Sequence, residues 1–163
     1  MDLNDPLPWD DGRFDTAILS SVLEHVHRPE QLLREVARIL SPGGRLVMNV
    51  PFFYWIHEAP HDYFRYTEFG LRRLAELAGL RVVELEALGG GRQVLADVLA
   101  KSIVRFPLGR LAARFVQWLA ARPRWTARGR RRAAKSARRF PLGYFMVAEK
   151  PGPAGVAAPA TSS

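Results

Sequence analysis

The chain has 163 residues, of which 48% are hydrophobic, and a formal net charge of +8. This length suits one ordinary domain. The absence of cysteine excludes disulfides and thiolate metal sites, and no apolar run reaches the roughly 18 residues that a membrane-spanning helix needs. Charge is unevenly distributed, because residues 1–97 hold 10 Lys/Arg and 15 Asp/Glu whereas residues 98–163 hold 14 and 1. We therefore expect an acidic part followed by a basic section, in a cytoplasmic protein.

A strand–helix–strand unit is predicted over residues 13–51. Residues 14–19 form a short apolar run, typical of a strand buried on both faces. Pro29 suits the first turn of a helix, which the sequence ends at Pro42-Gly43-Gly44. Residues 46–50 then form a second buried strand. The apolar stripe of the helix consists of Leu32, Leu33, Val36, Ile39 and Leu40. Such a crossover joins parallel strands, so the pattern predicts an α/β core.

Polar residues follow the first of these strands. Ser20 and Ser21 end it, and His25 comes shortly after. Ligands of open parallel sheets bind beyond the carboxyl ends of the strands, so a site is expected here. A lone histidine more often caps or packs than catalyses, so His25 by itself does not indicate proton transfer. Glu24 is interpreted as a partner of the helix dipole.

The segment 52–66 has the most unusual composition in the chain. Seven aromatic residues surround His57, His61 and Asp62. They follow a strand's carboxyl end, where a lid or substrate wall belongs, although each aromatic side chain by itself fits simple packing. Either histidine could act as a general base, with Asp62 orienting it. Because Pro60 argues against a helix that would bring the two histidines onto one face, no metal site is predicted.

The rest of the chain continues the α/β pattern and adds a helical section. Thr67 caps a helix that ends at Gly79, and a strand follows over residues 81–88. Residues 93–121 predict two short helices broken at Pro107, and residues 144–150 a final strand. These elements define an α/β domain over 1–92 and 140–150, a basic amphipathic helical insertion over 93–139, and a disordered tail over 151–163.

The basic section allows three interpretations. Residues 122–139 carry nine Lys/Arg and no acidic residue. They can form the solvated face of helices that cover the sheet edge or the pocket. They can instead rest on an anionic membrane, with peripheral contact through residues 98–139 at the inner surface, or reach a phosphate-bearing substrate. Nucleic acid is a third partner for such charge, but no recognition motif accompanies it, so none is expected.

Several short motifs, taken together, resemble those of class I S-adenosylmethionine-dependent methyltransferases of the small-molecule type 11 kind. Their order and spacing match over roughly residues 1–88 and again at 144–150. The matching pieces are Asp2-Leu3, Leu7-Pro8-Trp9, Phe14-Asp15, Val22-Leu23-Glu24-His25-Val26, Leu40-Ser41-Pro42-Gly43-Gly44 and Asn49-Val50-Pro51. The family's first strand, Gly-rich cofactor loop and the acidic residue after its second strand would precede Asp2, where only Met1 stands. The resemblance is therefore to the C-terminal part of the family.

The resemblance implies a fold and a set of cofactor contacts. The family's sheet order is 3-2-1-4-5-7-6, and this chain would supply an incomplete Rossmann-like sheet, 4-5-7-6, whose last strand is antiparallel. Asp2 and Leu3 would lie at the adenine of S-adenosylmethionine, with the Asp2 carboxylate accepting from the amino group. The turn at Ser20, with Ser21 and His25, would line the methionine part.

Two functional expectations follow. The first is methyl transfer from S-adenosylmethionine to a small-molecule, lipid or glycan acceptor, by a truncated enzyme that binds its cofactor weakly or not at all when alone. The second is a non-catalytic half-domain that pairs with a partner chain or an anionic membrane. The strand at residues 15–19 would be an exposed sheet edge in either case, which invites pairing with another chain.

Overall fold

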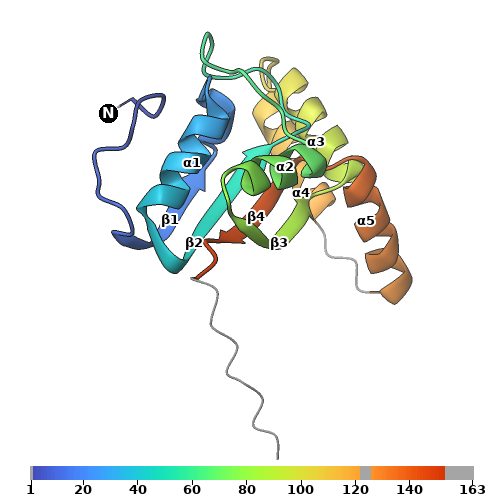
Figure 1. Ribbon diagram of the computed structural model, residues 1–163. Helices are drawn as coiled ribbons and strands as arrows, with labels where there is room; N and C mark the ends of the chain where they lie inside the picture. Colours follow the sequence, from blue (N-terminus) through green and yellow to red (C-terminus); the bar gives the residue numbers. More distant parts are fainter. Residues whose placement is uncertain (1, 122–125, 153–163) are drawn as a thin grey trace, which may run out of the picture.

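The computed structural model describes residues 2–121 and 126–152, and a four-stranded sheet lies at its centre (Figure 1). Strands β1 (Phe14–Ser20) and β2 (Leu40–Pro51) run parallel, with Ile18 opposite Val47. Strand β4 (Gly143–Glu149) is antiparallel to both of its neighbours, β2 and β3 (Arg81–Leu88). The order β1-β2-β4-β3 confirms the predicted incomplete Rossmann-like sheet.

Helix α1 (Pro29–Ile39) connects the two parallel strands, as predicted. Its apolar stripe is buried, and Leu40 turns into an extended conformation that ends the helix. Strand β2 starts at Leu40, earlier than the predicted residue 46, so the Pro42–Gly44 turn lies inside it. The register with β1 shifts between Phe14 and Thr16, which accommodates these extra residues as an irregularity of the pairing.

Helix α2 (Glu68–Leu77) begins and ends where the sequence predicts. The Thr67 side chain accepts a hydrogen bond from the Gly70 N–H at 3.2 Å, which satisfies one of the free donors of the first turn. Gly79 follows the helix with a φ of +73°, a conformation that favours glycine. Leu80 then packs back into the core, and its N–H bonds the Ala75 carbonyl at 2.9 Å.

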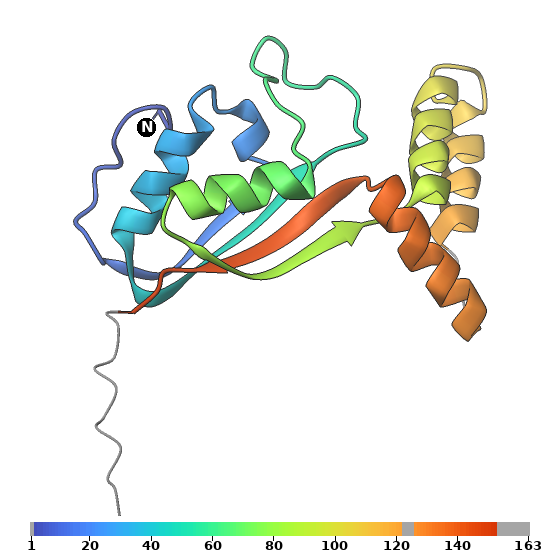
Figure 2. The ribbon, with the colours of Figure 1, turned by 45° about the vertical axis from the view of Figure 1, so that its right-hand side comes forward.

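The sheet is covered on one face only within the described ranges. Figure 2 shows α1 and α2 over the same face. The core lies between them and the sheet, and includes the fully buried Leu33, Leu46 and Met146. On the opposite face the Ile18 side chain is 70% exposed. The prediction that the first strand is buried on both faces is therefore wrong, because no described element lies over its second face.

Three helices lie beyond the end of the sheet at which β2 and β3 finish and β4 begins (Figure 2). They are α3 (Gly91–Ile103), α4 (Gly109–Ala121) and α5 (Ala127–Arg139). Helices α3 and α4 pack side by side, with the predicted break at Pro107 between them. Residues 122–125 of the basic run and 153–163 of the expected disordered tail lie outside the described residues. Within the described ranges, no helix combines the length and apolar character required to cross a membrane.

Candidate functional site

The carboxyl-terminal tips of β1 and β2 form the floor of the candidate site. Ser20 pairs with Asn49, and the Ser21 N–H donates to the Asn49 carbonyl at 3.1 Å. The Asn49 side-chain amide in turn donates to the Ser21 hydroxyl at 3.4 Å. Ser21 has a φ of +50°, a conformation uncommon for residues other than glycine, and it turns the chain sharply out of the sheet. The two parallel strands thus end side by side at the same edge of the sheet, as predicted.

The turn after Ser21 buries an acidic residue. Leu23–His25 form a short 3-10 helix, η1, and the Glu24 side chain is completely buried. Neither of its carboxylate oxygens has a hydrogen-bond partner among the described residues, and burial raises the pKa of Glu24. Glu24 stands in the first turn of η1, where an acidic residue can interact with the helix dipole, but its side chain is buried in the protein rather than exposed at the surface.

His25 lies at the edge of this turn with one ring nitrogen occupied. Its Nδ1 is 2.7 Å from the carbonyl oxygen of His61. Because a carbonyl oxygen can only accept, Nδ1 carries the proton, and Nε2 is left as the acceptor nitrogen in the neutral ring. That Nε2 lies 3.8 Å from Oε1 of Glu24.

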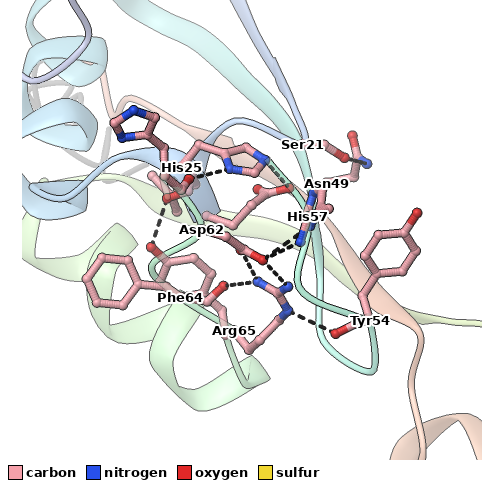
Figure 3. Close-up of polar contacts among 12 residues, drawn as sticks. Ser21, His25, Asn49, Tyr54, His57, Asp62, Phe64 and Arg65 are labelled. Carbon is pink, nitrogen blue, oxygen red and sulfur yellow. Dashed lines mark hydrogen bonds and ion pairs between the residues drawn. The ribbon is translucent and has the colours of Figure 1, made fainter. Parts of the chain in front are cut away.

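Asp62 is the centre of the polar contacts in the segment 52–66 (Figure 3). Its side chain is only 2% exposed, and Arg65 binds both carboxylate oxygens. The carboxylate also accepts from the His57 N–H at 2.9 Å and lies 3.3 Å from His57 Nδ1. The Arg65 guanidinium holds the pKa of Asp62 far below its usual range. Asp62 therefore contacts His57, whereas His61 Nδ1 meets the Tyr63 hydroxyl at 2.9 Å.

Backbone contacts fix the same segment over η1. The N–H groups of Tyr63 and Phe64 donate to the Glu24 carbonyl at 2.9 and 3.3 Å. The Arg65 guanidinium donates to the Trp55 carbonyl at 2.9 Å, so it joins the two arms of the segment. Tyr66 is buried, and its hydroxyl donates to the Leu23 carbonyl at 3.1 Å. These hydrogen bonds hold the segment 52–66 in place as one wall of the site.

An open hollow of about 510 Å³ lies between the turn after β1 and the wall segment 52–66. The predicted residues Ser21, His25, His57 and His61 line it together with Glu58. The structure therefore brings four of the eight predicted site residues together in one hollow. On an α/β sheet, such a hollow can hold a small molecule between a backbone floor and a polar wall.

Asp2 and Leu3, the other predicted cofactor residues, lie outside this hollow. Asp2 is exposed, and its carboxylate accepts from the Asn4 N–H at 2.9 Å, a bond that lowers the pKa of Asp2. Asn4 in turn accepts from the His27 N–H at 3.1 Å, which ties this loop to the turn after β1. Leu3 lines a separate apolar groove along β1. The loop thus lies at the same end of the sheet as η1.

Sequence reasoning missed the structural importance of Glu24 and Arg65. Both stand in motifs described above, but the burial of Glu24 depends on hydrogen bonds from Tyr63 and Phe64, which sequence spacing does not reveal. A charged residue inside the apolar pattern Val22-Leu23-Glu24-His25-Val26 was the available signal.

Sequence comparisons agree with this architecture. A family model described as "Methyltransferase domain" matches residues 1–48. The chain is 53% identical over 45 residues to an uncharacterized 37.1 kDa protein in transposon TN4556 of Streptomyces fradiae, covering 28% of this chain and 13% of that protein. It is 32% identical over 102 residues to the ubiquinone/menaquinone biosynthesis C-methyltransferase UbiE of Ruegeria sp., covering 62% and 36%.

Solved structures share the fold. A chain in the complex between the Haloferax volcanii Trm112 methyltransferase activator and the putative methyltransferase has a TM-score of 0.56 and 22% identity, covering 94% of this chain and 60% of that chain. A putative methyltransferase from Bacillus halodurans gives 0.54 and 13%, covering 93% and 70%. The cyclase SpnF gives 0.54 and 19%, covering 94% and 55%.

The methyltransferase-domain match over residues 1–48 and the sheet order β1-β2-β4-β3 support the resemblance, drawn from the sequence, to class I S-adenosylmethionine-dependent methyltransferases. The chain spans only 13% and 36% of the two curated relatives above. Because a cyclase shares the fold, the fold alone does not fix the reaction.

Proposed function

We propose that this chain forms the acceptor-side half of a class I methyltransferase that uses S-adenosylmethionine. The observation that carries the proposal is the side-by-side pairing of β1 and β2, whose tips open together into the hollow lined by Ser21, His25 and His57. The methionine part of the cofactor would lie over Ser20 and Ser21, with the acceptor against the wall formed by residues 52–66.

Methyl transfer requires few catalytic groups from the protein. Methyl transfer from a sulfonium is an in-line displacement, in which the acceptor bonds to the methyl carbon as the carbon–sulfur bond breaks. Orientation therefore matters most, and a base is needed only for a protonated acceptor. His57, beside Asp62, and His61, on the rim of the hollow, are the two histidines placed to take that proton.

Relatives suggest the first acceptor to assay. The matches include the UbiE protein of Ruegeria sp. and a demethylmenaquinone methyltransferase of Renibacterium salmoninarum, to which the chain is 34% identical over 77 residues. Both are named for quinone methylation. A reduced quinone also suits the aromatic wall segment, where Tyr54 packs against His57 and Tyr63 against His61, since flat rings pack well against such side chains.

The open edge of β1 bears on cofactor affinity. Class I methyltransferases hold the cofactor through further strands on this side, and among the described residues β1 is an edge strand that pairs with β2 alone. We propose that additional strands of a methyltransferase sheet pair with this edge, in line with the expected pairing with another chain. The loss of two or three polar contacts at roughly 1–3 kcal/mol each weakens binding by orders of magnitude. The 163-residue chain alone is then a weak binder.

Equilibrium dialysis with radiolabelled S-adenosylmethionine tests the assignment. We expect a dissociation constant well above the micromolar range for the chain, and weaker binding still for Asp2→Ala. Asp5→Ala is the matched control, because Asp5 lies in the same loop and is also exposed. Equal effects of the two substitutions would remove Asp2 from the cofactor site, and micromolar affinity would contradict the role proposed for the open edge.

A second candidate function is attachment to an anionic membrane, and the helices at the end of the sheet favour it. Leu111, Phe115 and Trp118 on α4 are more than half exposed. Helix α5 carries seven Lys/Arg and no acidic residue. Exposed apolar side chains and a basic helix at the same end of a sheet are typical of surfaces that rest on a lipid interface.

Liposome flotation tests this candidate. With vesicles that contain anionic lipid we expect the chain to float at low salt and to be released at high salt. The double substitution Arg131→Glu, Arg132→Glu should abolish flotation, whereas Arg72→Glu on α2 should not. A chain that stays at the bottom of the gradient at low salt excludes membrane attachment.

A further inference from the structure

We propose that Glu24, His25 and His57 bind a divalent transition-metal ion. Each residue offers one ligand atom, and the three atoms lie within 4.8 Å of one another. They come from two separate parts of the chain, η1 and the wall segment 52–66, which the backbone bonds from Tyr63 and Phe64 to Glu24 hold together. The inference concerns metal binding alone and does not depend on methyl transfer.

The strongest observation is the Glu24 carboxylate. It is fully buried, and both of its oxygens are without a hydrogen-bond partner among the described residues. A buried polar group that finds no partner is strongly unfavourable, so proteins pair such groups or give them a metal. A divalent cation between Glu24 and the two histidines would bind the Glu24 carboxylate and offset the cost of its burial.

His25 is already oriented as a ligand. Its Nδ1 proton is donated to the His61 carbonyl at 2.7 Å, which fixes the ring and leaves the Nε2 lone pair on the side of Glu24, 3.8 Å from Oε1. Metal-binding histidines characteristically donate their second ring N–H to a carbonyl or carboxylate in this manner. Because the free lone pair of His25 Nε2 faces a carboxylate without a hydrogen-bond partner, a metal ion between the two groups explains their arrangement better than packing does.

His57 completes the set from the wall side. Its ring packs edge-on against His25, with ring centroids 4.7 Å apart, and its Nδ1 is buried without a hydrogen bond although Asp62 lies 3.3 Å away. Asp62 is itself neutralised by Arg65. Within the cluster of Glu24, His25 and His57, Glu24 is therefore the carboxylate that would attract a cation, and Asp62 lies next to His57 as a supporting carboxylate.

The ligand types point to zinc or a metal with similar preferences. Two imidazoles and one carboxylate are the protein ligands of many zinc sites that keep an open position, whereas Mg²⁺ and Ca²⁺ favour oxygen ligands. The open position would face the hollow lined by Ser21 and Glu58. An oxygen of a bound acceptor could be held there, and with His57 acting as a ligand, His61 would be the histidine left to take a proton.

This site differs from the one that the sequence argued against. The prediction of no metal site considered His57 and His61, which a helix would have had to bring together. The structure instead pairs His57 with Glu24 and His25 across the crevice. His61 contributes its backbone carbonyl to His25, not a ring nitrogen.

Titration of the untagged, chelator-treated full chain with Co²⁺ tests the proposal. We expect one equivalent to bind with visible absorption bands that Zn²⁺ displaces. Glu24→Gln, which keeps the side chain's size, should weaken binding more than about 100-fold, because it removes the charged ligand. His27→Ala is the control, since His27 lies close in sequence but outside the cluster.

A second variant keeps the test decisive if Glu24→Gln does not fold. His57→Ala lies in a loop and should leave the chain folded, as judged by circular dichroism, while abolishing the Zn²⁺-induced rise in melting temperature. Absence of Co²⁺ and Zn²⁺ binding at millimolar concentration would overturn the proposal. So would binding that Glu24→Gln or His57→Ala leaves unchanged.

Discussion

Asp62 and Arg65 form the buried ion pair on which the wall of the hollow depends. Arg65 binds both carboxylate oxygens and also reaches the Trp55 carbonyl, while Asp62 accepts from His57. Removing one partner of such a pair leaves the other charged group buried, which is strongly unfavourable. The shape of the site therefore follows from two residues that lie three positions apart.

Arg65→Met should lower the free energy of unfolding by about 3 kcal/mol, in the range seen when a buried pair loses one partner. Arg73→Met is the matched control, because the pair of Arg73 with Glu76 is exposed on both sides and should contribute less than about 1 kcal/mol. Urea denaturation of both variants measures the difference. Equal losses would mean that the wall does not depend on the Asp62–Arg65 pair.

Glu35 and Arg38 bind the loop before β1 to helix α1. Glu35 accepts from the Leu7 N–H at 2.8 Å and from Arg38, and Arg38 donates to the Leu7 and Trp9 carbonyls. The bonds from Arg38 and Leu7 lower the pKa of Glu35, with Arg38 the larger cause. This small network positions the loop that carries Asp2 and Leu3.

The lowered pKa of Glu35 predicts how stability depends on pH. A carboxylate with a lowered folded-state pKa adds stability above its ordinary value of 4.5, and this stability is lost as the pH falls through the folded-state value. Glu35→Gln should therefore be less stable than the original chain at pH 7, with the difference in stability closing as the pH falls below 4.5. Urea midpoints measured across this range check it, and a constant gap would contradict it.

At the scale of elements, sequence pattern predicted the α/β units well. The Pro29 start of α1, the Thr67 cap of α2 and the break at Pro107 all depend on neighbouring residues, so the sequence contains their cause. The long β2 was not predicted, because its first residues pair with β1 through an irregular register that only tertiary contacts determine.

The candidate site was predicted in its location but not in its internal contacts. Ser21, His25 and His57 were placed near the strand tips because that rule depends only on topology. The pairing of Asp62 with His57 rather than His61, and the burial of Glu24, depend on how residues 52–66 fold back over η1. No pattern of neighbouring residues in the sequence predicts that residues 52–66 fold back over η1.

Strand β1 provides a direct test of the uncovered sheet face. Ile18→Ala should change the free energy of unfolding by less than about 0.5 kcal/mol, since the side chain is 70% exposed. Leu46→Ala, at a fully buried position on the neighbouring strand β2, should cost about 2–5 kcal/mol. A large loss from Ile18→Ala would show that this face is covered in solution.

At the scale of the whole molecule, three regions with different surfaces meet. One sheet face is covered by α1 and α2, and the other is uncovered within the described residues (Figure 2). A basic helical section lies at the end of the sheet where β2 and β3 finish. It contacts the wall segment there, because Lys101 Nζ lies 3.5 Å from the centre of the Tyr54 ring. The wall segment 52–66 therefore contacts helix α3 on one side and lines the hollow with His57 and His61 on the other, so it lies between the proposed membrane surface and the acceptor side.

The central claim is that the tips of β1 and β2 hold the methionine end of S-adenosylmethionine. Backbone amide NMR of the 163-residue chain, titrated with S-adenosylhomocysteine to millimolar concentration, tests it most directly. We predict weak binding, with shift changes concentrated at Ser20, Ser21 and His25 and absent at Gly43 and Lys150, which hydrogen-bond to each other at the opposite end of the sheet. Shift changes centred on Gly43, or none at any concentration, would contradict the account.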